Sequence, residues 1–308
     1  MTTPTARFEA DVISAFGRHL LARDESGTVW RARPFGRQLQ IVCGDRVHCE
    51  RDAQGEVLAL EVLPRRTALL RSNLRGVSEP IVANLDCLAV VLAPVPRPDL
   101  FMVDRYLCAA ASAGLAALLV VNKSDLSLEP DDAAGLEGLA ALGYGLHRVG
   151  AHDGTGLEAL AAALSGHTSV LVGQSGVGKS SLIRRLAVDG EQAVTGELMR
   201  EAEGRHTTTA SRLYDCISGG RIIDSPGVRD YAPSLDQLEP VTLGFVEVQR
   251  LAPHCRFMDC RHMSEPQCAV IAGVGSGISA RRYESYRRLR RLVEQLQSER
   301  GPRTRGRR

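Results

Sequence analysis

Eight residues in the middle of the 308-residue chain have the spacing of a phosphate-binding loop, G-x-x-x-x-G-K-S. The loop follows the apolar run 169–172 and precedes a helix-like stretch, which is the context that this motif needs. Its glycines let backbone N–H groups turn toward phosphate oxygens, and the following helix presents its positive N-terminus. Lys179 is predicted to reach the β- and γ-phosphates, and the Ser180 hydroxyl to ligate Mg²⁺. The predicted phosphate-binding residues are Gly173, Gln174, Ser175, Gly176, Val177, Gly178, Lys179, Ser180 and Ser181.

A second polar motif, N-K-S-D, follows the apolar run 118–121. It therefore lies at the carboxyl end of a predicted strand, where open α/β sheets bind ligands. In the pattern N-K-x-D, with which GTPases read guanine, the carboxylate of Asp125 can accept hydrogen bonds from N1–H and the 2-amino group. Adenine does not offer this pair of donors, and a site built for such bonds rejects a base that lacks them. Alone the motif could be an ordinary turn, but beside a phosphate loop it predicts guanine binding by Asn122, Lys123, Ser124 and Asp125.

A third segment, which begins at Gly150, is predicted to complete the base pocket. Gly150 and Ala151 stand where a GTPase normally carries Ser-Ala, the loop whose alanine N–H holds the guanine O6. The backbone donor of Ala151 is kept. The hydroxyl that would stabilise the loop is missing, because glycine replaces serine.

Two further motifs are candidates for contact with the γ-phosphate and its metal ion. In the sequence G-R-H-T-T-T, Thr207 or Thr208 is predicted to close over Mg²⁺ and the γ-phosphate. In the sequence D-S-P-G, which follows an apolar stretch, Asp224 is predicted to contact the Mg²⁺ shell. The N–H of Gly227 is predicted to contact the γ-phosphate.

The residue that would orient the attacking water is not in its usual place. Ras-like enzymes carry a glutamine after the glycine of this last motif, whereas Val228 follows Gly227 here and cannot hydrogen-bond water. The water-orienting group must therefore come from elsewhere in the chain or from a partner. We predict that His206 positions or deprotonates the water, with Lys179 as the second catalytic residue. The alternative for His206 is a surface or packing histidine.

The order of these motifs is reversed relative to Ras-like GTPases, because the guanine motif precedes the phosphate loop. This predicts a circularly permuted GTPase domain, which is physically reasonable since domain termini often lie close together. The loop that begins at Asp224 then leads directly into the C-terminal region. Nucleotide state is therefore expected to reposition that region.

Four potential metal ligands lie within fourteen residues near the C-terminus. Three cysteines and one histidine suit a tetrahedral structural zinc site with no open position for catalysis. Helices are expected on either side of the cluster, at 235–251 and 278–296, the second packing on the metal loop with arginines on its outer face. The predicted ligands are Cys255, Cys260, His262 and Cys268. His254, which adjoins Cys255, is a possible substitute ligand.

The first seventy residues read as short strands with turns between them. Strands are expected at 12–16, 28–33, 39–43, 46–50 and 56–63, and about five strands in some sixty residues favour a small barrel, most simply an OB-fold. A linker is expected at 64–76. The predicted domains are an all-β OB-fold barrel at 1–70, an α/β circularly permuted P-loop GTPase domain at 74–232, and a small helical zinc-binding domain with a basic tail at 233–308.

Composition and charge distribution indicate the class of binding partner and the cellular compartment. The net charge is +2, but residues 281–308 hold eleven arginines and three glutamates, a local charge of about +8 that suggests contact with nucleic acid or another polyanion. No apolar run approaches the ~18 residues of a membrane helix, and no apolar signal core is present, so a cytoplasmic protein is expected. The five remaining cysteines are expected to be buried thiols. The lack of a heptad pattern predicts a monomer.

Taken together, these motifs resemble the ribosome small-subunit-dependent GTPase A family over nearly the whole chain. The resemblance implies an OB domain, a permuted GTPase domain and a zinc domain. It also implies GTP hydrolysis stimulated by the small (30S) ribosomal subunit, and a role in late maturation of that subunit and its 16S rRNA. Within this family the histidine that matches His206 serves hydrolysis. Gly150 and the arginine-rich tail depart from the family pattern.

Two other functions compete with this interpretation. The first is a GTPase switch that acts on a protein partner, with the barrel and the zinc unit as adaptors. The second is a structural RNA-binding module with a vestigial nucleotide site, against which the intact Lys179, Ser180, Asp224 and Asp125 argue.

Overall fold

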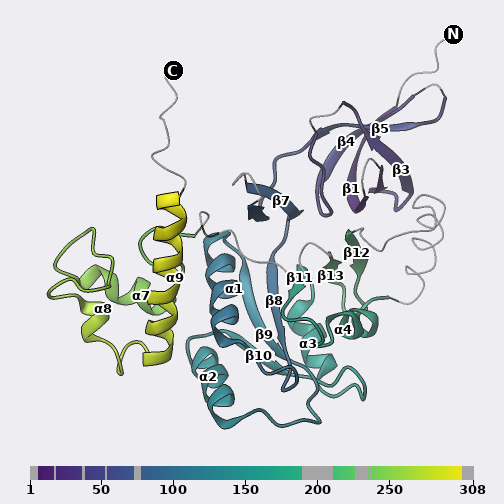
Figure 1. Ribbon diagram of the computed structural model, residues 1–308. Helices are drawn as coiled ribbons and strands as arrows, with labels where there is room; N and C mark the ends of the chain where they lie inside the picture. Colours follow the sequence, from purple (N-terminus) through teal and green to yellow (C-terminus); the bar gives the residue numbers. More distant parts are fainter. Residues whose placement is uncertain are drawn as a thin grey trace, which may run out of the picture.

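The computed structural model describes residues 6–16, 19–36, 39–52, 54–72, 78–188, 211–225, 235 and 238–299. Figure 1 shows a β-barrel at the N-terminal end, a central α/β unit, and a helical unit at the C-terminal end on the opposite side of the α/β unit from the barrel. Four predicted site residues, His206, Thr207, Thr208 and Gly227, lie outside the described part of the chain.

Five strands close the N-terminal barrel, as predicted. They are β1 Ala6–Phe16, β2 His19–Asp24, β3 Val29–Pro34, β4 Arg46–Arg51 and β5 Val57–Val62. Strand β1 pairs with both β2 and β4, while β3 pairs in parallel with β5, which gives the closed order β1-β2-β3-β5-β4. The barrel is OB-like.

One predicted strand of the barrel is wrong and another was missed. Residues 39–43 form only a single bridge, from Cys43 to Val82, because the Asp45 carboxylate accepts a hydrogen bond from the Val42 N–H at 2.8 Å and bends the chain into a turn. The strand β2, which was not predicted, is the fifth strand of the barrel instead. The expected linker at 64–76 is also wrong in part, since β6 Ala68–Ser72 and β7 Ser78–Ala83 pair as an antiparallel hairpin.

The α/β unit is a sheet covered by helices on both faces. Its strands lie in the order β10-β9-β8-β11-β13-β12, parallel except for β12. All six residues of β8 are buried, because helices α1 and α2 pack on one face of the sheet and α3 and α4 on the other. The elements are β8 Cys87–Leu92, α1 Leu100–Ser112, β9 Ala116–Val121, α2 Pro130–Ala141, β10 Gly145–Arg148, α3 Leu157–Leu164, β11 Thr168–Val172, α4 Lys179–Leu186, β12 Ser211–Asp215 and β13 Arg221–Asp224.

The barrel and the central sheet are joined edge to edge. The end of β1 pairs with the start of β12, which makes one continuous eleven-stranded sheet. Two ion pairs flank this junction, Arg23 with Asp215, and Arg221 with Asp11 at 2.9 Å. The barrel is therefore attached to the strand that leads toward Asp224.

The C-terminal unit is helical, as predicted, but its first helix is shorter than expected. It contains α7 Val246–Leu251, the 3-10 helix η2 Ala252–His254, α8 Ala269–Ala272 and α9 Ala280–Glu299. Residues 240–244 are turn instead of helix, because the Glu239 carboxylate accepts from the backbone N–H groups of Val241 and Thr242 and fixes that turn. None of the helices in the described residues combines the length and the apolar character that crossing a bilayer requires.

A buried ion cluster fastens the C-terminal unit to the α/β unit. Arg282 of α9 donates to Asp104 of α1 at 2.7 Å and, through two nitrogens, to Glu247 of α7 at 2.7 and 2.8 Å. All three side chains are at most 4% exposed. Arg290 is also buried and donates to the carbonyls of Pro240 and Val241. The prediction that the α9 arginines form an outer basic face is therefore wrong for these two residues.

We expect Arg282→Leu to lower the free energy of unfolding of this region by about 3–5 kcal/mol, because it leaves Asp104 and Glu247 buried without their partner. Urea unfolding followed by circular dichroism measures the change. The control is Arg291→Leu, which removes an exposed pair with Glu284 at 3.8 Å and is expected to change stability by about 1 kcal/mol or less. Equal effects of the two substitutions would contradict the account of the cluster.

Candidate functional site

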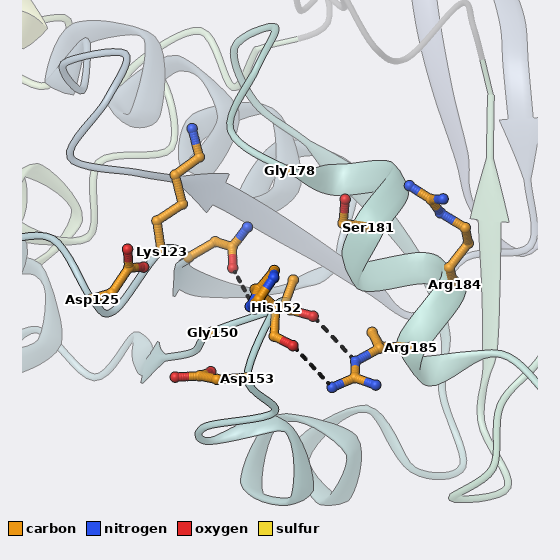
Figure 2. Close-up of a pocket in the computed structure, with 11 residues that line it drawn as sticks. Lys123, Asp125, Gly150, His152, Asp153, Gly178, Ser181, Arg184 and Arg185 are labelled. Carbon is orange, nitrogen blue, oxygen red and sulfur yellow. Dashed lines mark hydrogen bonds between the residues drawn. The ribbon is translucent and has the colours of Figure 1, made fainter.

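Loops from three parallel strands meet at the carboxyl edge of the central sheet. The guanine motif follows β9, the loop that begins at Gly150 follows β10, and the phosphate loop follows β11. They enclose a pocket of about 600 Å³ (Figure 2). The predicted site residues that line it are Asn122, Lys123, Asp125, Gly150, Ala151, Gly178 and Ser181. Two stretches in reversed order along the chain therefore form one pocket.

The side chain of Asn122 holds these loops together. Its Nδ2 donates to the carbonyl of Val177 in the phosphate loop at 2.8 Å, and its Oδ1 accepts from the Ala151 N–H at 3.0 Å. Asn122 is 2% exposed. A Cβ at Gly178 would lie 2.2 Å from its Nδ2, so only glycine lets the asparagine reach the loop. One residue thus fixes the spacing between base-side and phosphate-side elements.

The phosphate loop has the strand–loop–helix geometry that its sequence predicts. Gly173 has φ of +139°, and a Cβ there would lie 2.0 Å from the Val91 carbonyl oxygen of β8. The helix α4 begins at Lys179, whose Nζ donates to the carbonyls of Gly173 and Gln174 at 2.7 Å each. The glycines form a cradle that larger residues would fill.

The other residues of the guanine motif are anchored by the backbone. The Ser124 N–H donates to the carbonyl of Val149 at 3.1 Å, and Lys123 Nζ donates to the carbonyl of Val95 at 2.6 Å. Lys123 adopts a φ of 61°. Asp125 lines the pocket from the loop that these contacts fix (Figure 2).

Four further pocket residues were not predicted from the sequence, namely His152, Asp153, Arg184 and Arg185. Arg185 donates to the carbonyls of Ala151 and His152 at 3.1 and 3.3 Å, so it ties α4 to the third loop. It lies four residues after Ser181 on α4, on the same helical face, and that spacing was a signal available in the sequence.

Asp224 lies at the same edge of the sheet. It ends β13, which pairs in parallel with β11, the strand that leads into the phosphate loop. The predicted switch residues His206, Thr207, Thr208 and Gly227 lie outside the described residues, so their roles stay predictions.

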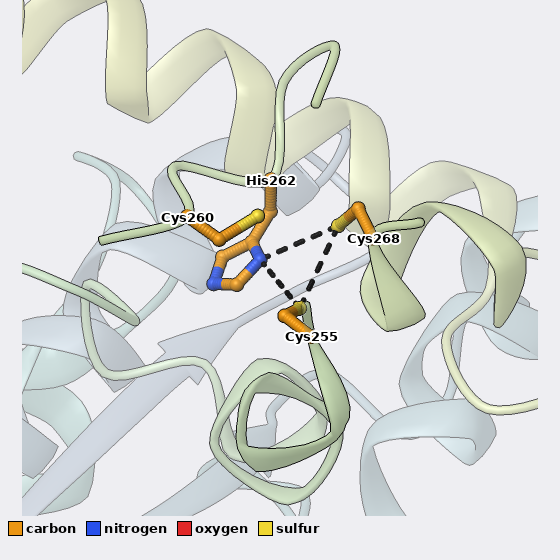
Figure 3. A group of neighbouring side chains, drawn as sticks. All are labelled: Cys255, Cys260, His262 and Cys268. Atoms are coloured by element: carbon orange, nitrogen blue, oxygen red, sulfur yellow. Dashed lines mark hydrogen bonds between the residues drawn. The ribbon is translucent and has the colours of Figure 1, made fainter. Parts of the chain in front are cut away.

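The second candidate site is the cysteine–histidine cluster of the C-terminal unit (Figure 3). Its four ligand atoms lie within 4.8 Å of one another. The Cys255 and Cys268 sulfurs are 3.8 Å apart, and each lies 3.5 Å from Nδ1 of His262. A tetrahedral zinc ion with Zn–S distances of about 2.3 Å requires S···S and S···N edges of roughly 3.8 and 3.5 Å. The cluster is therefore compatible with zinc, whereas His254 is exposed and is not part of it.

The loop that carries the cluster is fixed from outside. Tyr283 and Tyr286 of α9 donate to the carbonyls of His262 and Arg261 at 3.0 and 2.8 Å, as the predicted packing of this helix requires. The Glu265 carboxylate accepts from three backbone N–H groups of the loop. Burial alone would raise the pKa of Glu265, but these N–H donors outweigh it and lower the pKa to about 2. The five cysteines elsewhere are buried thiols that form no disulfide, as expected.

Comparisons with known proteins agree with this geometry. A family model described as RsgA GTPase matches residues 62–233. Proteins named small ribosomal subunit biogenesis GTPase RsgA from Azotobacter vinelandii and Pseudomonas aeruginosa are 42% and 40% identical over 287 and 284 residues, and each alignment covers 90% of this chain and 83% of the relative.

Two solved structures share the fold. The crystal structure of YjeQ from Thermotoga maritima has a TM-score of 0.71 and 28% identity, over 94% of this chain and 99% of that one. YloQ, described as a circularly permuted GTPase, has a TM-score of 0.71 and 24% identity, over 95% of this chain and 96% of that one. The predicted fold class, a permuted GTPase domain with an N-terminal barrel, is confirmed.

We expect the purified protein to hold about one zinc ion per chain and Cys260→Ser to lose it. Burial raises the pKa of the Cys260 thiol to about 12, so metal must displace its proton and affinity should rise with pH. Elemental analysis after dialysis measures the content. The control is Cys216→Ser, a buried thiol outside the cluster, which should keep the metal. Full zinc content in Cys260→Ser would contradict the assignment.

Proposed function

Because this chain belongs to the RsgA GTPase family, we propose that it binds GTP in the pocket between Asn122–Asp125 and the phosphate loop and hydrolyses it on the small ribosomal subunit. The observation that carries this proposal is the contact from Asn122 Nδ2 to the Val177 carbonyl. It joins the base-reading motif to the phosphate-reading motif, as a single nucleotide site requires.

The proposed roles follow from position. Asp125 reads the guanine base. The Ala151 N–H, which donates to Asn122 Oδ1 at 3.0 Å, is proposed to be shared with the guanine O6 when the base is bound. The loop from Gly173 to Ser181, which includes Lys179, holds the phosphates. The family implies GTP or GDP and Mg²⁺, and bound Mg²⁺ neutralises charge on the β- and γ-phosphate oxygens. Ser180 and Asp224 are the residues proposed to hold it. The Ser180 hydroxyl lies in the first turn of α4, and the Asp224 carboxylate lies at the end of β13, which pairs in parallel with β11.

For the switch residues, the proposal rests on sequence alone. Thr207 or Thr208 and the Gly227 N–H contact the γ-phosphate side, and His206 serves the attacking water.

Structural Zn²⁺ is held by Cys255, Cys260, His262 and Cys268. The proposed domains are 1–70, 74–232 and 233–308.

The proposed partner is the small (30S) ribosomal subunit, in whose late maturation the protein acts through contacts with 16S rRNA. Support comes from the names of the relatives, which are small ribosomal subunit biogenesis GTPases. Residues 300–308 add five arginines and no acid, a charge suited to RNA phosphates. The protein is proposed to act as a monomer in the cytoplasm, where bacterial subunits are assembled.

We expect Asp125→Asn to weaken GDP binding by about 100-fold, because two hydrogen bonds to a charged acceptor are lost. The same variant should gain affinity for XDP, since xanthine carries a carbonyl at C2 to which the new amide can donate. Isothermal titration calorimetry with GDP, XDP and ADP measures this. Equal affinities of the wild-type protein for ADP and GDP would contradict the proposed guanine site.

We expect multiple-turnover GTP hydrolysis to rise on adding purified small subunits and to stay basal with large subunits. His206→Ala should lose most of the stimulated rate while keeping GDP affinity, because the histidine is proposed to act on water and not on the base. Unchanged stimulated turnover would eliminate that role. Subunit binding measured between 50 and 200 mM salt should weaken steeply if RNA is the partner, and only slightly if the partner is a protein.

A further inference from the structure

The loop that follows β10 differs from the usual Ser-Ala loop at its first residue, Gly150. The backbone conformation does not require glycine at this position, because the φ of Gly150 lies outside the left-handed region. The requirement for glycine is instead steric. A Cβ at Gly150 would lie 2.0 Å from the Asp153 Oδ1 atom and 2.9 Å from the Ser124 Oγ atom. The Asp153 carboxylate therefore fills the volume that a side chain at position 150 would occupy.

We propose that Asp153 is the positioning residue of the loop that reads the guanine O6, and that its carboxylate gives the support which a hydroxyl at position 150 would otherwise give. This rests on the proposed nucleotide site. Asp153 touches the loop and not, in this role, the nucleotide.

The hydrogen bonds of the loop show how the carboxylate closes it. Asp153 Oδ1 accepts from the Thr155 N–H at 3.0 Å, and the Thr155 carbonyl accepts from the Gly150 N–H at 2.9 Å. The Gly154 N–H donates in turn to the Gly150 carbonyl at 2.8 Å. The hydrogen bond from the Thr155 backbone N–H, and after it the one from the Thr155 side chain, lower the pKa of Asp153. The group that holds the turn is therefore a carboxylate at neutral pH.

The position of this turn sets the position of the base-reading donor. The Ala151 N–H meets Asn122 Oδ1 at 3.0 Å, and the Ala151 carbonyl accepts from Arg185 Nε at 3.1 Å. The backbone of Ala151 is therefore held by contacts with the guanine motif and with α4. The loop that carries Ala151 is also held by the turn that Asp153 closes. Figure 2 shows Asp153 and Asp125 at the same side of the pocket. Loss of the carboxylate frees one end of the loop without removing any predicted base or phosphate contact.

The test compares GDP with 6-thio-GDP, which keeps the N1–H and 2-amino groups for Asp125 but replaces O6 with the weak acceptor sulfur. We expect Asp153→Ala to raise the Kd for GDP about 10-fold and to change the Kd for 6-thio-GDP less than about 2-fold. Asp153→Asn keeps an acceptor oxygen and should stay within about 2-fold of wild type for both ligands. The matched control is Glu158→Ala, an exposed carboxylate in the first turn of α3.

A second pair of variants tests the shared volume directly. Gly150→Ser should weaken GDP binding, because its Cβ displaces the Asp153 carboxylate. The double variant Gly150→Ser with Asp153→Ala should recover to within about 3-fold of wild type. The new Cβ then meets only the Ser124 Oγ atom at 2.9 Å, a hydroxyl that can rotate away and leave the serine room to support the loop. Each variant is checked for a wild-type thermal midpoint.

Independent effects, with the double variant weakened by the product of the two single changes, would overturn the proposal. So would equal losses of GDP and 6-thio-GDP affinity in Asp153→Ala. A wild-type protein without preference for GDP over ADP would instead overturn the nucleotide site itself, so the two failures are distinguishable.

Discussion

The Asn122 side chain is the contact on which the rest of the site depends. It donates to the phosphate loop through Nδ2 and accepts from the third loop through Oδ1, while it lies buried behind Gly178. Because a buried amide must satisfy its polar atoms, the asparagine is stable only when all three loops are in place. The chain order of the loops is then irrelevant to the pocket, and this explains how a permuted sequence can build a guanine nucleotide site.

Local signals in the sequence were sufficient to predict the motif-bearing elements. The apolar runs before Asn122 and Gly173 are the strands β9 and β11, and α4 begins at Lys179 as its motif requires. These features depend on neighbours within a few residues. The cysteine–histidine cluster was predictable for the same reason, since its four residues lie close together in the chain.

The features that the sequence did not reveal depend on distant partners. The inward direction of Arg282 is set by Asp104, which lies 178 positions earlier. The turn at 240–244 replaces a predicted helix because the Glu239 carboxylate competes for its N–H groups. The strand pairing of β1 with β12 likewise joins residues about two hundred positions apart. In each case apolar periodicity carried no information about the contact that decided the structure.

The two outer units are held to the central sheet by contacts of different strength. The barrel is attached by the backbone pairing of β1 with β12 and by Ile13, Leu21 and Cys43, which share a buried core with the central sheet. The ion pairs that flank this junction have side chains that are 21–41% exposed, and such pairs contribute little each. The C-terminal unit is held by ion pairs from Arg282 that are almost fully buried and cannot be separated without leaving unpaired charges. The sequence led us to expect that nucleotide state repositions the C-terminal unit through the loop after Asp224. Such a movement must keep the Asp104–Arg282–Glu247 cluster intact, so it has to carry α1 with it. The barrel is tied more directly to the region of Asp224, because β1 pairs with β12, and β12 pairs in turn with β13.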